Sequence, residues 1–70
     1  MNVLDIFGNN LKSFRLKNKL SQLKLSELSG IHWTYISQVE NGKKNISLIK
    51  INNLANALNV SVVELLKGIK

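Results

Sequence analysis

Apolar residues recur at helical spacing in five stretches of the chain, and short polar or glycine-containing breaks separate these stretches. The clearest period, in the fourth stretch, is formed by Leu48, Ile51, Leu54, Ala55 and Leu58. No stretch shows the sustained alternation of apolar and polar residues that is typical of a strand. The pattern therefore predicts an all-α fold, a compact five-helix bundle. The expected helices cover about residues 5–18, 22–29, 33–41, 48–58 and 62–67.

Residues that cap free backbone amides precede the expected helices. Ser21 stands before the second helix, and Ser61 with Glu64 forms a capping box at the start of the fifth. Asp5 is the expected N-cap of the first helix. The large apolar residues on one face of each helix are expected to form the core: Phe7, Leu11, Phe14, Ile36, Val39, Leu48, Ile51, Leu54, Leu58, Leu65 and Leu66.

Composition limits what the protein can be. Seventy residues, of which 44% are hydrophobic, suffice for one small domain, expected to span residues 1–70. The chain has no cysteine and one histidine, so disulfides are excluded and no metal or other cofactor is expected. The acidic residues form no paired-carboxylate site, and nothing supports catalysis. Because there is no secretory pattern and no membrane-length apolar run, we expect a soluble, cytoplasmic protein. We also expect no small-molecule ligand.

The charge of the chain is strongly positive. Ten basic residues against four acidic ones give a net charge of +6. Such an excess on a small folded domain favours a polyanionic partner, most often nucleic acid and less often an acidic membrane surface. A single one of the ten basic residues, Arg15, is an arginine, so its role needs an individual explanation.

The second and third expected helices form a recognisable pair. They are joined by Ser29-Gly30-Ile31-His32, where the glycine can take the positive φ that turns the chain sharply and Ile31 can plug the corner. This is the layout of a helix-turn-helix, although ordinary bundles contain it too. The outward face of the third helix offers hydroxyl, amide and aromatic groups that suit base edges in the major groove. These residues are Trp33, Thr34, Ser37 and Gln38, with Tyr35 beside them.

The same region resembles a known family. Ser21-Gln22, Gly30 and above all the run YISQVENGKKNISL that starts at Tyr35 are similar to the Cro/C1-type helix-turn-helix family, also called the xenobiotic-response-element family. The resemblance covers about residues 7–66 and is strongest, over residues 32–48, to the controller proteins of restriction–modification systems. It implies a lambda-repressor-like DNA-binding domain. Such a domain acts as a homodimer on a two-fold symmetric operator in double-stranded DNA and regulates transcription.

The resemblance also implies roles for individual residues. Trp33, Thr34, Ser37 and Gln38 correspond to base-reading positions, and Tyr35 to a position that reads the backbone or the shape of the DNA. Gln22 is expected to bind phosphate and to brace the recognition helix. Asn41, Lys43 and Lys44 correspond to the loop that holds phosphates. Controller proteins commonly have arginine at the position of Trp33, so the usual guanine contact is absent and the operator sequence stays open.

Three residues have competing interpretations. Arg15 can contact phosphate, but the family pattern places it opposite Glu40, and we favour an ion pair because an acidic residue near DNA needs a neutralising partner. His32 can titrate, although a helix cap or a phosphate contact is the favoured role. Trp33 can anchor the core, yet its place at the start of an exposed helix favours contact with DNA.

The last helix carries apolar residues without an obvious place in the core, Val63 and Ile69. Exposed apolar residues at one end of a small domain commonly mark an interface, so we expect a homodimer with Val63 at its centre and Ile49 or Ile69 at its rim. Two other functions compete with a transcription regulator. One is an antitoxin that binds a toxin partner as well as DNA, and the other is a regulatory domain cut from an enzyme such as a DNA methyltransferase.

Overall fold

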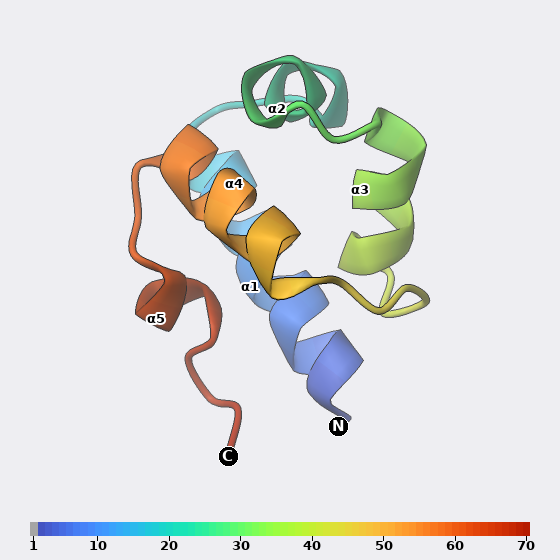
Figure 1. Ribbon diagram of the computed structural model, residues 1–70, viewed down its shortest axis with the longest axis vertical. Coiled ribbons are helices and arrows are strands. Elements are labelled where there is room, and N and C mark those ends of the chain that lie inside the picture. The colour runs from blue at the N-terminus through green and yellow to red at the C-terminus, as the bar shows by residue number, and fades with distance from the viewer. Residues whose placement is uncertain (1) are drawn as a thin grey trace.

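Five helices make up the computed structural model, which describes residues 2–70. They are α1 (Val3–Lys17), α2 (Gln22–Ser29), α3 (Trp33–Glu40), α4 (Leu48–Leu58) and α5 (Val62–Leu65), with no strand among the described residues. In Figure 1, α4 crosses in front of α1, α2 lies across the top, α3 forms the right-hand side and α5 the lower left. The predicted all-α, five-helix class is confirmed. No helix within residues 2–70 has both the length and the apolar character needed to cross a membrane.

Side-chain caps set most of the helix starts. Ser21 Oγ accepts a hydrogen bond from the Lys24 amide at 2.9 Å. Ser61 Oγ accepts from the Glu64 amide at 3.1 Å while the Glu64 carboxylate accepts from the Ser61 amide at 2.9 Å, which is the predicted capping box. Such reciprocal bonds satisfy amides that have no partner inside the helix, and this is why these starts were predictable.

Two helix ends differ from the prediction. The N-cap of α1 is Asn2, not Asp5, because the Asn2 side chain already accepts from the Asp5 amide at 3.0 Å and the helix gains most of a turn. Asp5 lies in the first turn instead, where its charge suits the positive end of the helix. At the other end of the chain, α5 stops at Leu65 because Asn10 Nδ2 donates to the carbonyls of Leu65 and Lys67, at 2.9 and 2.8 Å.

The core is continuous and contains the expected residues with one clear exception, and Leu25, Ile31 and Ala55 add to it. Leu48 is 70% exposed, although it continues the apolar period of α4. Ile51 is already at the edge of the core, 9% exposed, and Leu48 lies one turn further out, where no other element covers it. Phe14 and Leu66 are half-buried against the core. The buried apolar residues are Phe7, Leu11, Leu25, Ile31, Ile36, Val39, Ile51, Leu54, Ala55, Leu58 and Leu65.

A glycine sets the distance between α1 and α3. Gly8 is buried, and a Cβ atom at this position would lie 2.4 Å from the Val39 carbonyl oxygen and 2.8 Å from that of Glu40. Both oxygens are backbone atoms, so no side-chain rotation relieves such a clash. Because Gly8 has no side chain, α1 can lie directly against the C-terminal end of α3. This close packing fixes the position of α3.

Candidate nucleic-acid interface

The turn between α2 and α3 has the geometry expected from its sequence. Gly30 has φ +76° and ψ 11°, the left-handed conformation that ends α2, and its amide donates to the Ser26 carbonyl at 2.9 Å. Ile31 follows in the corner and is buried. The helix that comes next, α3, lies at the edge of the molecule with Ile36 and Val39 packed into the core (Figure 1). One face of α3 is thus fixed by the core and the opposite face is free.

The expected base-reading residues share that free face. Trp33, Thr34 and Gln38 are exposed and Ser37 is half-buried. Ser37 and Gln38 follow Thr34 by three and four residues, and Ser37 follows Trp33 by four, so these side chains occupy neighbouring positions of the helix surface. They offer hydrogen-bond donors and acceptors and an indole ring, and none is acidic. The face therefore has the chemistry of major-groove readout without a charge that repels phosphate.

His32 and Trp33 take defined positions at the start of α3. His32 is the N-cap, its Nδ1 accepts from the Thr34 amide at 3.2 Å, and the same nitrogen contacts the Thr34 hydroxyl. The His32 ring stacks on that of Trp33 with 5.9 Å between centroids. His32 is thus a helix cap. Trp33 is 46% exposed, so the alternative of a core anchor is wrong.

Directly beneath this face, Arg15 and Glu40 form a buried ion pair. Arg15 Nε and Nη2 donate to the two carboxylate oxygens of Glu40 at 2.7 and 3.0 Å, and Nη1 donates to the Leu20 carbonyl at 2.8 Å. Both residues are less than 9% exposed. The pair joins α1 to the end of α3 and neutralises the one acidic side chain of the recognition helix. The structure therefore contains the ion pair that we favoured over a phosphate contact for Arg15.

Gln22, nearer the surface, forms a further hydrogen bond to the carboxylate of this ion pair. Its Nε2 donates to Glu40 Oε1 at 3.1 Å, and its side chain is half-buried at the start of α2. This bond links α2 to α3, so all three helices meet at the Glu40 carboxylate. Gln22 thus braces the recognition helix through this hydrogen bond, as expected. Its contact with phosphate stays a prediction.

The loop after α3 is tied to the recognition helix. Asn41, Lys43 and Lys44 are exposed, and the Lys43 amide donates to the Gln38 carbonyl at 2.9 Å. Further along, the Tyr35 hydroxyl donates to the Asn45 carbonyl at 2.7 Å. Gly42 adopts φ +71°, and a Cβ atom here would lie 2.2 Å from the Asp5 carboxylate. The expected phosphate-binding loop is thus held beside the exposed face of α3.

Lys50 also belongs to this region, although no sequence pattern predicted its place there. Its Nζ lies 4.1 Å from the centroid of the Tyr35 ring, and Lys44 Nζ lies 5.6 Å from the same centroid. Lys50 belongs to the first turn of α4, fifteen residues after Tyr35, and the intervening loop brings the two together. No local pattern predicts a contact across an irregular loop, whereas the charge of Lys50 was visible as one of ten basic residues.

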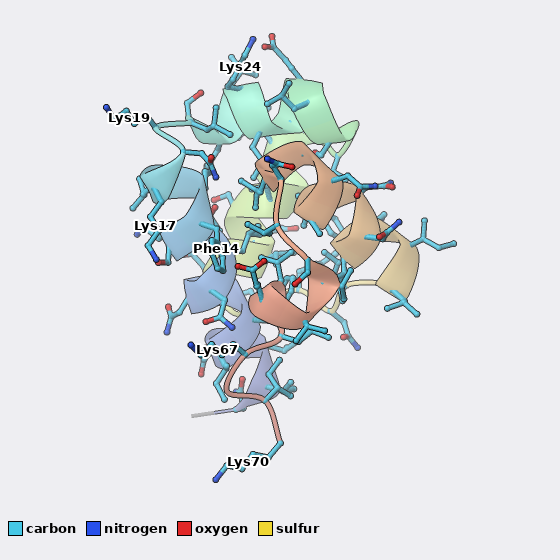
Figure 2. All side chains as sticks on the ribbon, turned by 90° about the vertical axis from the view of Figure 1, so that its left-hand side faces the viewer. Phe14, Lys17, Lys19, Lys24, Lys67 and Lys70 are labelled. Carbon is cyan, nitrogen blue, oxygen red and sulfur yellow. The ribbon has the colours of Figure 1, made fainter. Side chains whose placement is uncertain are left out.

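Positive charge is not confined to this side of the molecule. Figure 2 turns toward the reader the side that is on the left in Figure 1, away from α3, and labels Lys17, Lys19, Lys24, Lys67 and Lys70 there. Lys24 pairs with Glu27 at 3.6 Å. Net charge alone therefore does not identify the binding face. The face is identified by the combination of an exposed helix without free acids and a lysine-bearing loop beside it.

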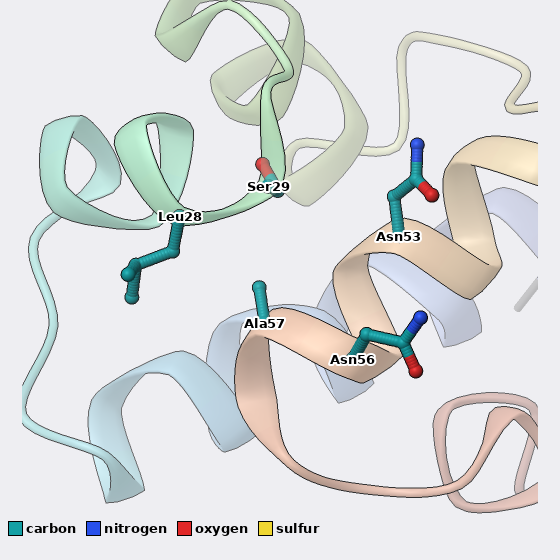
Figure 3. Close-up of a pocket in the computed structure, with 5 residues that line it drawn as sticks. All are labelled: Leu28, Ser29, Asn53, Asn56 and Ala57. Atoms are coloured by element: carbon teal, nitrogen blue, oxygen red, sulfur yellow. The ribbon is translucent and has the colours of Figure 1, made fainter.

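The pocket between α2 and α4 is a different kind of feature. It has a volume of about 380 Å³ and is lined by Leu28 and Ser29 from α2 and by Asn53, Asn56 and Ala57 from α4 (Figure 3). None of the five side chains is charged, and Ser29 Oγ already accepts a hydrogen bond from the Ile31 amide at 3.2 Å. The pocket thus lacks the acid, base and activated nucleophile that an active site requires.

The most exposed large apolar side chains lie on α5 and at the start of α4. Val63 is 77% exposed and Ile49 75%, and Leu48, which the sequence assigned to the core, adds to them. Ile69 differs from the expectation, because it is half-buried and packs against the core cluster. It has a place there because Gly68, at φ +88°, turns the last residues back toward α1. Val63 and Ile49 remain exposed, as the predicted dimer interface requires. Ile69, the other residue predicted at its rim, is partly covered by the core cluster.

Comparisons with known proteins agree with this geometry. A family model described as helix-turn-helix matches residues 11–65. The chain is 44% identical to control protein C.SmaI of Serratia marcescens, with all of the chain and 86% of that protein covered. It is 39% identical to control protein C.BamHI of Bacillus amyloliquefaciens, over 93% of the chain and 82% of that protein. The crystal structure of the restriction–modification controller protein C.AhdI from Aeromonas hydrophila superposes with a TM-score of 0.87 at 42% identity, covering 89% and 94% of the two chains.

Proposed function

The chain belongs to the Cro/C1-type helix-turn-helix family, and from this membership we propose that it is the controller protein of a restriction–modification system. It is a DNA-binding transcription regulator. The observation that carries the proposal beyond family membership is the exposed face of α3, whose one acidic residue is neutralised from below by Arg15. A helix with free polar side chains and no free acid is suited to the major groove.

In this proposal α3 enters the major groove and its side chains read base edges. Gln38 pairs bidentately with adenine, Thr34 and Ser37 bond to several kinds of base edge, and Trp33 contacts a thymine methyl group. Because the indole ring stands where controller proteins commonly have arginine, the operator has no guanine contact from this position. The base preference at the corresponding step of the operator therefore differs from that of arginine-bearing relatives.

The residues around α3 hold the DNA backbone. Asn41, Lys43 and Lys44 contact phosphates from the loop after α3, Gln22 contacts a phosphate at the start of α2, and Tyr35 contacts the backbone or senses its shape. The exposure of the loop residues and the hydrogen bond from Lys43 to Gln38 support this arrangement. Contacts of this kind set orientation and register on the duplex, whereas base contacts supply specificity.

The protein acts as a homodimer on a two-fold symmetric operator. The exposed apolar residues Val63, Ile49 and Leu48 support an interface formed by α5 and the start of α4, with Ile69 at its rim. Two recognition helices then lie about 34 Å apart, the length of one duplex turn, and enter successive major grooves on one side of the DNA.

This is a binding function without catalysis, exerted on cytoplasmic DNA. The antitoxin alternative is the weaker one, because the two relatives compared above are control proteins and the chain spans 86% and 82% of their lengths. A regulatory domain cut from a methyltransferase has no support from these relatives.

One substitution in α3 and one in the loop after it test whether α3 reads bases while the loop holds the DNA backbone. Gln38→Ala is expected to lose discrimination at one base pair of each half-site, about 1–3 kcal/mol, with unchanged thermal stability because the side chain is exposed. Lys43→Ala is expected to weaken binding to all duplexes by a similar factor. Fluorescence anisotropy against a set of duplexes with single base changes measures both. Uniform weakening by both variants would show that the assigned reading surface is wrong.

A further inference from the structure

Two ammonium groups converge on one aromatic ring of the recognition helix. Lys50 Nζ lies 4.1 Å and Lys44 Nζ 5.6 Å from the Tyr35 ring centroid. We propose that Lys50 binds a backbone phosphate of the DNA beside Lys44, and that Tyr35 is the positioning residue that holds Lys50 for this contact. The inference rests on the proposed function, and it adds a phosphate site on α4 to the contacts made by α2, α3 and the loop.

The Tyr35 ring, which both ammonium groups approach, is held by a hydrogen bond at its hydroxyl and by packing against the core. The Tyr35 hydroxyl donates to the Asn45 carbonyl at 2.7 Å, and the half-buried ring packs against the core cluster. The backbone of Lys50 is fixed as well, because its amide donates to Ser47 Oγ at 3.2 Å in the N-cap of α4. The Lys50 ammonium thus occupies a defined place relative to α3, and less side-chain freedom is lost when it meets an anion.

The charges near the ring are not neutralised within the described residues. The ion pairs among residues 2–70 are Arg15–Glu40 and Lys24–Glu27, so neither Lys44 nor Lys50 has a carboxylate partner there. Two positive charges that approach one ring repel each other, and the attraction of each to the ring offsets part of this repulsion. An anion bound at Lys50 reduces this repulsion. Lys50 therefore favours an anionic partner from outside the protein.

The position of the site selects the DNA backbone as the source of that ligand. Tyr35 follows Thr34 directly in α3 and lies three residues before Gln38, so an anion at Lys50 lies beside the bases that α3 contacts. The phosphodiester groups of the duplex backbone supply anionic oxygens beside those bases. A phosphate bound from α4 would in addition fix the angle of α3 in the groove, because Lys50 and the base-reading residues belong to different helices.

Salt dependence of operator binding tests the contact. A dimer that engages about six to eight phosphates has a slope of log Kobs against log salt near −5 to −7. Lys50→Gln removes one contact from each protomer, so the slope is expected to become less negative by about 2, and the affinity loss between 50 and 200 mM salt to shrink by about tenfold. Lys50→Arg, which retains the charge, is expected to restore the slope.

Lys17→Gln is the matched control. Lys17 Nζ also lies over an aromatic ring, 5.3 Å from the Phe14 centroid, but on α1 and away from the loop after α3 (Figure 2). Its slope is expected to equal that of the unaltered protein. An unchanged slope for Lys50→Gln, in a protein whose own slope is near −6, would overturn the inference and leave the proposed function intact. A slope shallower than about −2 for the unaltered protein would instead contradict duplex binding itself.

The positioning role of Tyr35 has its own test. Tyr35→Phe retains the ring, so Lys50→Gln is expected to change the slope by the same amount in that background. Tyr35→Leu removes the ring, and in that background the effect of Lys50→Gln is expected to fall to less than half. A full effect of Lys50→Gln in the Tyr35→Leu background would overturn the positioning role.

Because Tyr35 packs against the core, a measurement on the unaltered protein accompanies the variants. Proton NMR is expected to show the Lys50 side-chain methylene signals shifted upfield by the ring current of Tyr35. This shift is expected to persist in Tyr35→Phe. Signals at the ordinary lysine positions would overturn the contact, whether or not Tyr35→Leu folds.

Discussion

Val63→Glu is expected to split the dimer into folded monomers and to lower operator affinity by about two to four orders of magnitude. Val63 is 77% exposed, so a charged side chain there meets solvent in the monomer and leaves the core intact. In the dimer the same charge would be buried against an apolar surface, which is strongly unfavourable. The affinity falls because each monomer then binds one half-site without the effective concentration that a linked second half-site provides.

Sedimentation measures the oligomeric state, and circular dichroism measures the fold. Leu16→Glu is the matched control, because Leu16 is 55% exposed on α1 and the substitution introduces the same charge. This control is expected to remain dimeric. A dimeric Val63→Glu variant would show that the interface lies elsewhere on the molecule.

Arg15→Ala is expected to reduce the free energy of unfolding by about 3–5 kcal/mol, more than the loss of any lysine side chain. The substitution leaves the buried Glu40 carboxylate with Gln22 as its remaining side-chain partner and removes the donor to the Leu20 carbonyl. The cost arises mainly from an unpaired buried charge and not from the intrinsic strength of the pair. Urea unfolding monitored by circular dichroism measures it.

A double-mutant cycle separates the ion pair from other effects of removing the arginine. Glu40→Gln removes the charge that Arg15 neutralises, so the double variant is expected to recover part of the stability lost in Arg15→Ala. Residues in direct contact usually show interaction energies of about 0.5–3 kcal/mol in such cycles. Additive losses would contradict the structural role of the pair.

Much of the fold could be predicted because its local signals are strong. Ser21, Ser61 and Glu64 mark helix starts by side-chain capping, and Gly30 marks the turn by its need for a positive φ. Where two adequate caps compete, local reasoning fails. Asn2 and Asp5 are both good N-cap residues, and the structure uses the one that gives the longer helix. Periodicity likewise shows which face of a helix is apolar, but not how far along the helix the core extends, and Leu48 lies beyond it.

The candidate site divides in the same way. The outward face of α3 follows from helical spacing, and the sequence resemblance assigned the Arg15–Glu40 pair. The contacts of Lys50 with Tyr35, of Gln22 with Glu40 and of Gly8 with the end of α3 join separate elements. They depend on the path of an irregular loop or on the distance between packed helices. Composition and periodicity determine neither the path of a loop nor the distance between two packed helices, so these contacts could not be predicted from the sequence.

The most direct test of the account is selection of bound duplexes from a random DNA pool by the unaltered protein. A homodimer with α3 in successive major grooves predicts an enriched motif with two-fold symmetry and half-site centres about one helical turn apart. Trp33 predicts that each half-site lacks the strongly preferred guanine that an arginine would specify. A motif without two-fold symmetry, or no enrichment over random duplex, would contradict sequence-specific binding by a symmetric dimer.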